Sequence, residues 1–163
     1  MLIKNARHAV AALALVLFAI PAAQAQTASQ TVTFAVNAIN QIAFVGAPSL
    51  TITTAVAGSA PTSVTDASST WAVTCNQTGA KISAAIASNM PAGLTLSANL
   101  AAPAGATSAL YQSLSTVSVD LVTGITKLAQ GSLTATYKLD ATAAAGVVSS
   151  ATRLVTYTIS GGV

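Results

Sequence analysis

The sequence predicts an all-β protein, an immunoglobulin-like antiparallel β-sandwich of about 7 to 9 strands that follows a cleaved signal peptide. Three observations predict this fold class. Apolar and polar residues alternate with a period of two in several short runs. Pro and Gly, which favour turns, separate these runs at short intervals. The polar positions of the runs are mostly Thr and Ser, and the β-branched Thr favours strands.

Residues 1–25 are typical of a secretory signal peptide. Lys4 and Arg7 precede an apolar run over residues 9–20, Pro21 ends the run, and Ala23-Gln24-Ala25 has the small residues of a cleavage site. Such a run rises only about 18 Å as a helix, which is too short for a hydrocarbon core of about 30 Å. We therefore expect a secreted mature chain, residues 26–163, that lies outside the cell, on its surface or in a periplasm and has no membrane span.

The first predicted strand covers residues 30–37. Val32, Phe34 and Val36 alternate there with smaller or polar residues, so one face of the strand is apolar. We expect this strand to fill its own sandwich as an ordinary first strand. The alternative is a donor strand that fills a groove in a neighbouring subunit.

Later runs predict the other strands and the core. Alternation predicts strands over residues 71–75, 81–86, 94–100, 133–139 and 153–160. Residues 111–125 fit either a strand or a helical turn, and residues 142–145 are too few for more than a loop or one turn. The candidate core residues on the apolar phase of these strands are Trp71, Val73, Cys75, Tyr137 and Tyr157.

The side chains available for catalysis are few. After residue 25 the chain has no His and no Glu, and Cys75 is its one cysteine. Ser-His-Asp and Cys-His arrangements and His-based metal sites are therefore excluded from the mature chain. Asp66 is predicted in a loop, Asp120 in the ambiguous stretch and Asp140 at a strand end, and none of them stands in a catalytic or calcium-binding motif. We interpret Asp66 and Asp140 as turn residues that accept local N–H groups. We predict no enzyme activity, no cofactor and no metal.

The composition also limits the kinds of molecule that the mature chain is expected to bind. The mature chain keeps four basic side chains against three aspartates, a net charge of +1, and has no basic stripe for nucleic acid. Trp71, Tyr137 and Tyr157 fall on the apolar phase of their strands, which favours core packing over a sugar platform, and Tyr111 is the freest of the aromatic residues. Cys75 cannot form an internal disulfide, and we expect a buried thiol; the alternative is an intermolecular bridge.

The signal peptide, the alternating residues 31–36 and the closing run at residues 155–159 resemble those of small bacterial secreted surface and fimbrial subunits. In the chaperone-usher fimbrial family, subunits polymerise by donating an N-terminal strand. The resemblance implies a structural protein whose partner is another copy or a different surface protein. The alternative is a soluble secreted module that binds a glycan or a protein.

Overall fold

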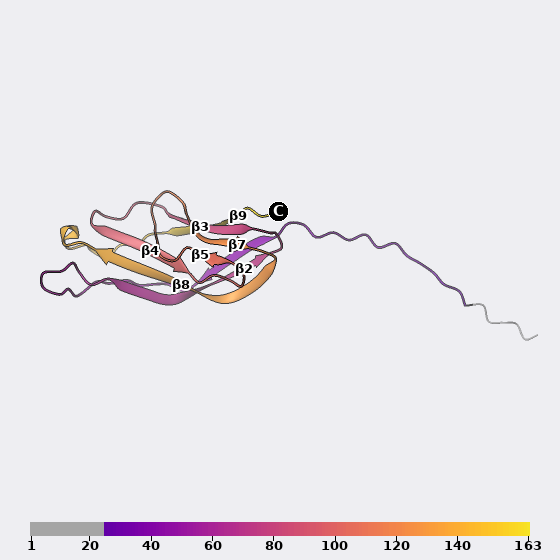
Figure 1. The fold of residues 1–163 in the computed structure, drawn as a ribbon, viewed down its shortest axis with the longest axis horizontal. Coiled ribbons are helices and arrows are strands. Elements are labelled where there is room, and N and C mark those ends of the chain that lie inside the picture. The colour runs from indigo at the N-terminus through magenta and orange to yellow at the C-terminus, as the bar shows by residue number, and fades with distance from the viewer. Residues whose placement is uncertain (1–24) are drawn as a thin grey trace, which may run out of the picture. The chain divides into compact units, whose positions relative to one another are not determined.

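The computed structural model describes residues 25–163. These residues fall into two units, residues 25–35 and residues 36–163. Residues 25–39 contain no helix or strand, and all nine strands of the described chain belong to the larger unit (Figure 1). The predicted signal peptide lies outside the described residues except for Ala25.

Two antiparallel sheets form the larger unit. The five-stranded sheet has the order β1 (Asn40–Val45), β2 (Val64–Cys75), β8 (Leu128–Ala141), β4 (Leu94–Leu100) and β6 (Gln112–Ser113). The four-stranded sheet has the order β5 (Thr107–Ser108), β7 (Val119–Ile125), β3 (Ala80–Ile86) and β9 (Val155–Ser160). One turn of 3-10 helix, η1 (Ala143–Ala145), follows β8. The predicted antiparallel β-sandwich is thus confirmed.

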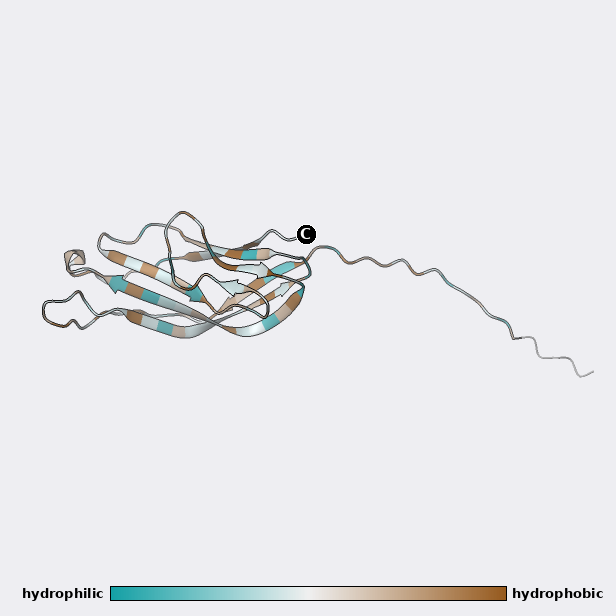
Figure 2. Ribbon diagram, viewed as in Figure 1, coloured by the Kyte–Doolittle hydropathy of each residue, from teal (hydrophilic) through white to brown (hydrophobic). Residues whose placement is uncertain are grey.

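Alternating side chains from both sheets form the core. Along β3 every second residue is buried, and Figure 2 shows hydrophilic and hydrophobic residues alternating along β8. The buried apolar residues of the described chain form one cluster. Its members are Trp71, Val73, Cys75, Ala80, Ile82, Ala84, Ile86, Leu96, Ala98, Leu100, Leu114, Leu121, Val122, Ile125, Leu133, Ala135 and Tyr137.

The prediction that residues 30–37 form the first strand of their own sandwich is wrong. Residues 25–39 form no strand, and the side chains of Val32, Phe34 and Val36 are 71%, 89% and 79% exposed. Within the described residues the two sheets consist of strands from residues 40–160, and β1 is one of the two edge strands of the five-stranded sheet. Residues 30–37 therefore alternate as a strand does, but they pair with no strand of the described chain.

The ambiguous stretch, residues 111–125, is extended rather than helical and contains β6 and β7. Leu121 and Val122 are both buried although they are neighbours, because the pairing of β7 with β3 is irregular at this point. Because this irregularity turns two neighbouring residues toward the core, Leu121, Val122 and Ile125 have a spacing in the sequence that also fits a helical turn.

Candidate functional site

One long side of the sandwich is a seam between β1, at the edge of one sheet, and β9, at the edge of the other. The Phe44 ring of β1 stacks on the Tyr157 ring of β9 with centroids 3.8 Å apart. The Tyr157 and Tyr137 hydroxyls are 2.6 Å apart and join the two sheets by a hydrogen bond. Burial raises the pKa of both hydroxyls above the ordinary value, so both stay neutral at physiological pH. This half of the seam is closed.

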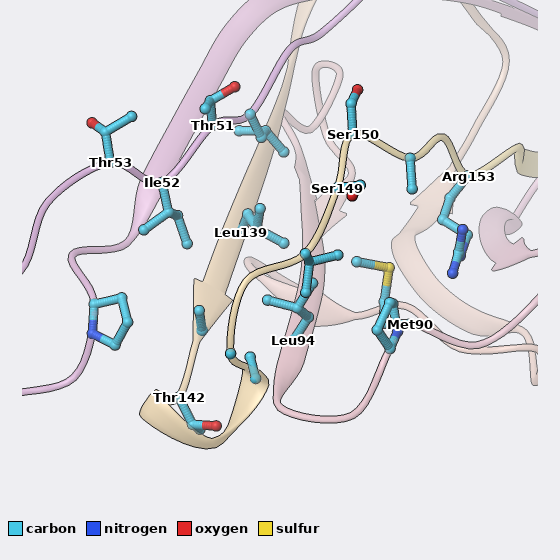
Figure 3. A pocket seen from close by; sticks show the side chains of 18 of the residues that line it. Thr51, Ile52, Thr53, Met90, Leu94, Leu139, Thr142, Ser149, Ser150 and Arg153 are labelled. Carbon is cyan, nitrogen blue, oxygen red and sulfur yellow. The ribbon is translucent and has the colours of Figure 1, made fainter.

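The other half of the seam is an open groove. Its volume is about 790 Å³. Residues 48–55, which follow β1, form one wall, and residues 148–153, which precede β9, form the other. Leu94 of β4 and Leu139 of β8 lie between the walls, and Met90 closes one side (Figure 3). The half-buried leucines give the groove an apolar floor.

The first wall is extended and has two unlike faces. Leu50 and Ile52 are half-buried, whereas Thr51 and Thr53 are exposed. Figure 3 shows the Ile52 side chain on the opposite side of the wall from Thr51 and Thr53. The wall is attached to the sandwich at its ends, where the Ser49 N–H donates to Asp66 Oδ2 (2.8 Å) and the Thr62 N–H donates to the Thr54 carbonyl (2.8 Å).

The backbone of both walls is largely unpaired. Within the described chain, no backbone hydrogen bond joins residues 50–53 or residues 147–151 to a neighbouring segment. Each such N–H or C=O group retains its full capacity for a hydrogen bond. The groove therefore has apolar residues at its floor and free backbone groups at its rims.

The structure places the predicted core residues inside the sandwich. Trp71, Val73 and Cys75 on β2 are at most 2% exposed, Tyr137 is buried, and Tyr157 is half-buried at the seam. None of them is available as a sugar platform. The Tyr111 side chain is 40% exposed, and the Lys138 ammonium lies 5.5 Å from the centroid of its ring.

The carboxylate of each of the three aspartates contacts a hydroxyl, N–H or ammonium group of the sandwich. Asp66 does not lie in a loop as predicted but within β2, at an irregularity in the pairing with β8. Its carboxylate accepts hydrogen bonds from the Ser68 hydroxyl and from the Ser68 and Ser49 N–H groups, and these bonds lower its pKa. Asp120 pairs with Lys81 at 3.0 Å.

The third aspartate, Asp140, lies near the end of β8 as predicted, but it accepts no backbone N–H in the described chain. The Ser63 hydroxyl donates to it, and the Lys138 ammonium lies 3.0 Å away. Both contacts lower its pKa, and the hydroxyl does so more strongly. Within residues 25–163, no three His, Cys, Asp or Glu side chains are grouped so that they could hold a metal ion.

The groove was missed in the sequence. The two walls are about a hundred residues apart along the chain, so no local pattern joins them. The single local signal is the alternation of Leu50 and Ile52 with Thr51 and Thr53, which predicts an extended segment with one apolar face.

Cys75 provides a test of how tightly the end of β2 is packed. The thiol is buried, and the Gln77 N–H donates to its sulfur at 3.4 Å. We expect slow labelling by a thiol reagent in the native protein and fast labelling after unfolding. A matched control is Thr74→Cys in a Cys75→Ser background, because residue 74 is the exposed neighbour on the same strand. Fast native labelling of Cys75, or a dimer that disappears on reduction, would show an accessible thiol.

No helix among residues 25–163 has the length and apolar character needed to cross a membrane. No family model, curated protein or solved structure matches this chain.

Proposed function

We propose that the mature chain is a non-enzymatic structural subunit of an extracellular or cell-surface assembly, and that it associates with further copies of itself. The observation that carries this proposal is the exposed apolar row formed by Val32, Phe34 and Val36. An alternating row of large apolar side chains left in water is costly, and in proteins it usually marks a surface that another molecule covers.

The remaining side chains support a structural role. The carboxylates of Asp66, Asp120 and Asp140 each bind neighbouring hydroxyl, amide or ammonium groups. The mature chain contains no imidazole and no glutamate. General acid–base catalysis normally depends on such groups in a cleft, and the open groove of this sandwich holds only Arg153 as a charged side chain.

The test compares assembly of the exported protein with that of a variant whose row is polar. We expect the wild-type protein to form oligomers or filaments in negative-stain electron microscopy and light scattering. The segment variant, Val32→Ser with Phe34→Ser and Val36→Ser, should be monomeric, because its apolar contact is lost.

The matched control changes the opposite face of the same segment. Thr33→Ser with Ala35→Ser retains the apolar row and should assemble as the wild-type protein does. A wild-type protein that is monodisperse and monomeric at every concentration tested would contradict the proposal.

A second candidate function is a soluble secreted module that binds a glycan or another protein. The open groove favours a protein ligand, and the exposed Tyr111 ring favours a glycan. Such a module is a stable monomer with one binding site. The same assembly measurement therefore separates the two functions.

A further inference from the structure

The outer face of the five-stranded sheet carries an aromatic ring beside an ion pair. Tyr111 directly precedes β6, and its side chain is 40% exposed. The Lys138 ammonium of β8 lies 5.5 Å from the centroid of the Tyr111 ring and 3.0 Å from Asp140 Oδ2. Lys138 and Asp140 alternate with Tyr137 of the core, so they lie on the face of β8 that is turned away from the core. The ring and the two charges therefore share one side of the sheet.

Strand pairing on both sides fixes the position of the ion pair. Lys138 lies opposite Thr65 of β2 and Ser97 of β4, and Asp140 lies opposite Thr95 of β4. Side chains on a strand that is paired in this way are positioned more precisely than side chains on a loop. The exposed hydroxyls of Thr65 and Thr95 add polar groups around the pair.

The turn before β6 holds Tyr111 at the sheet. The Ser108 hydroxyl donates to Asn99 Oδ1 of β4 (3.0 Å) and accepts a hydrogen bond from the Leu110 N–H (3.1 Å). Ser97 lies on the outer face of β4, and yet it is only 5% exposed, so neighbouring side chains cover it. The Tyr111 ring is thus anchored beside the sheet while part of its surface stays in water.

The ion pair can still bind further polar groups. The Ser63 hydroxyl donates to Asp140 Oδ1, and the Lys138 ammonium contacts Oδ2. A carboxylate has about four acceptor sites and an ammonium has about three donor hydrogens, so both groups have unused positions. The Lys138 and Asp140 side chains are 32% and 34% exposed, which leaves these positions open to a ligand.

We propose that Tyr111, Lys138 and Asp140 form a binding site for a neutral saccharide. The C–H face of a pyranose packs on the aromatic ring, while its hydroxyls donate to the carboxylate and accept from the ammonium. The charges of Lys138 and Asp140 cancel, so neither an acidic nor a basic sugar gains a net attraction. This inference goes beyond the proposed structural role and does not depend on association of the copies.

The open sheet face determines the affinity expected of the site. Much of a sugar bound there stays in contact with water, and we expect a dissociation constant of about 1 mM for one copy and one sugar unit. A polysaccharide that meets several copies on one surface is bound more tightly, because each further contact is intramolecular. The natural ligand is therefore a repeated neutral saccharide rather than a free monosaccharide.

An NMR titration of the isotope-labelled mature protein tests the site directly. The probes are the methyl glycosides of glucose, galactose, mannose and N-acetylglucosamine. We expect at least one of them to shift the amide signals of Tyr111, Lys138 and Asp140 in a saturable way. Resonances of the remaining sandwich should stay in place, and in each variant they report that the protein is folded.

Two site variants and two controls separate binding from structure. Tyr111→Ala should weaken binding at least about tenfold, and Tyr111→Phe, which keeps the ring, should bind within about threefold of the wild type. Lys138→Met removes the donor hydrogens and should also weaken binding at least about tenfold. The matched control is Lys81→Met, because the Lys81 ammonium also lies 3.0 Å from an aspartate, Asp120, but contacts no aromatic ring within residues 25–163.

Three results would overturn this inference. The first is the absence of a saturable shift with every probe. The second is a set of shifts centred on the groove residues Leu94 and Leu139 instead of on Tyr111. The third is a Tyr111→Ala variant that binds as tightly as the wild type. Assembly of the wild-type protein is measured separately and bears only on the proposed structural role.

Discussion

Replacing Trp71 with alanine is expected to lower the free energy of unfolding by about 3–5 kcal/mol. The ring is 1% exposed and sits on β2 between Phe44 of β1 and Leu133 of β8. Its centroid lies 6.0 Å from that of Phe44 in a stacked arrangement. Alanine would leave a cavity where three strands meet, and the paired strands on either side restrict how far they can move to fill it.

Far-UV circular dichroism during denaturant unfolding measures this loss, since Trp71 is the only tryptophan and its fluorescence disappears in the variant. Val45→Ala in the adjacent strand is the control, because Val45 is 71% exposed. That change should cost no more than about 0.5 kcal/mol. A loss below about 1 kcal/mol for Trp71→Ala would mean that the ring is not part of the core, and it would revive the sugar-platform interpretation.

Gly46→Ala is expected to destabilise the protein by about 2–4 kcal/mol. Gly46 directly follows β1 and has a φ of +124°, a conformation that side-chain-bearing residues rarely adopt. A Cβ atom at this position would lie 2.8 Å from the Cα of Ser69 on β2, and that backbone cannot move without disturbing its pairing with β8. The unfavourable φ and the close contact with Ser69 therefore both lower the stability of the Gly46→Ala variant.

Gly58→Ala separates the two effects. Gly58 also has a positive φ, +83°, but a Cβ atom there would meet nothing within 4 Å. We expect this control to cost only about 1 kcal/mol, the price of the backbone conformation alone. Equal losses for the two variants, measured by thermal or denaturant unfolding, would show that the contact with Ser69 is not tight.

The alternation of apolar residues predicted the centre of the sandwich because each central strand has one face against the core. Trp71, Val73 and Cys75 lie on that face of β2, as the spacing requires. The first half of β2 was missed, since Val64 is its one large apolar residue up to Thr70 and pairing with β8 holds it in place. Strand pairing depends on the backbone of a partner strand that is distant in the sequence, so residues next to Val64 in the sequence do not reveal it.

Residues 30–37 show the opposite failure. The pattern of Val32, Phe34 and Val36 has the period of a strand, but these residues form none in the described chain, because alternation alone does not provide a strand to pair with. The groove could not be predicted from the sequence for a similar reason. Its walls come from the segments before β2 and before β9, and only the folded topology brings them to one seam.

The antiparallel pairing of β1 with β2 determines how the sandwich responds to tension. A pull on residues 37–39 that is resisted at the Val64 end of β2 acts along β1 from its first residue. Six residue pairs join the two strands, from Asn40 with Cys75 to Val45 with Thr70. Their hydrogen bonds run perpendicular to the strands, so this force shears all six pairs together and does not open them one at a time. A force that enters through residues 37–39 would thus act on all six residue pairs at once.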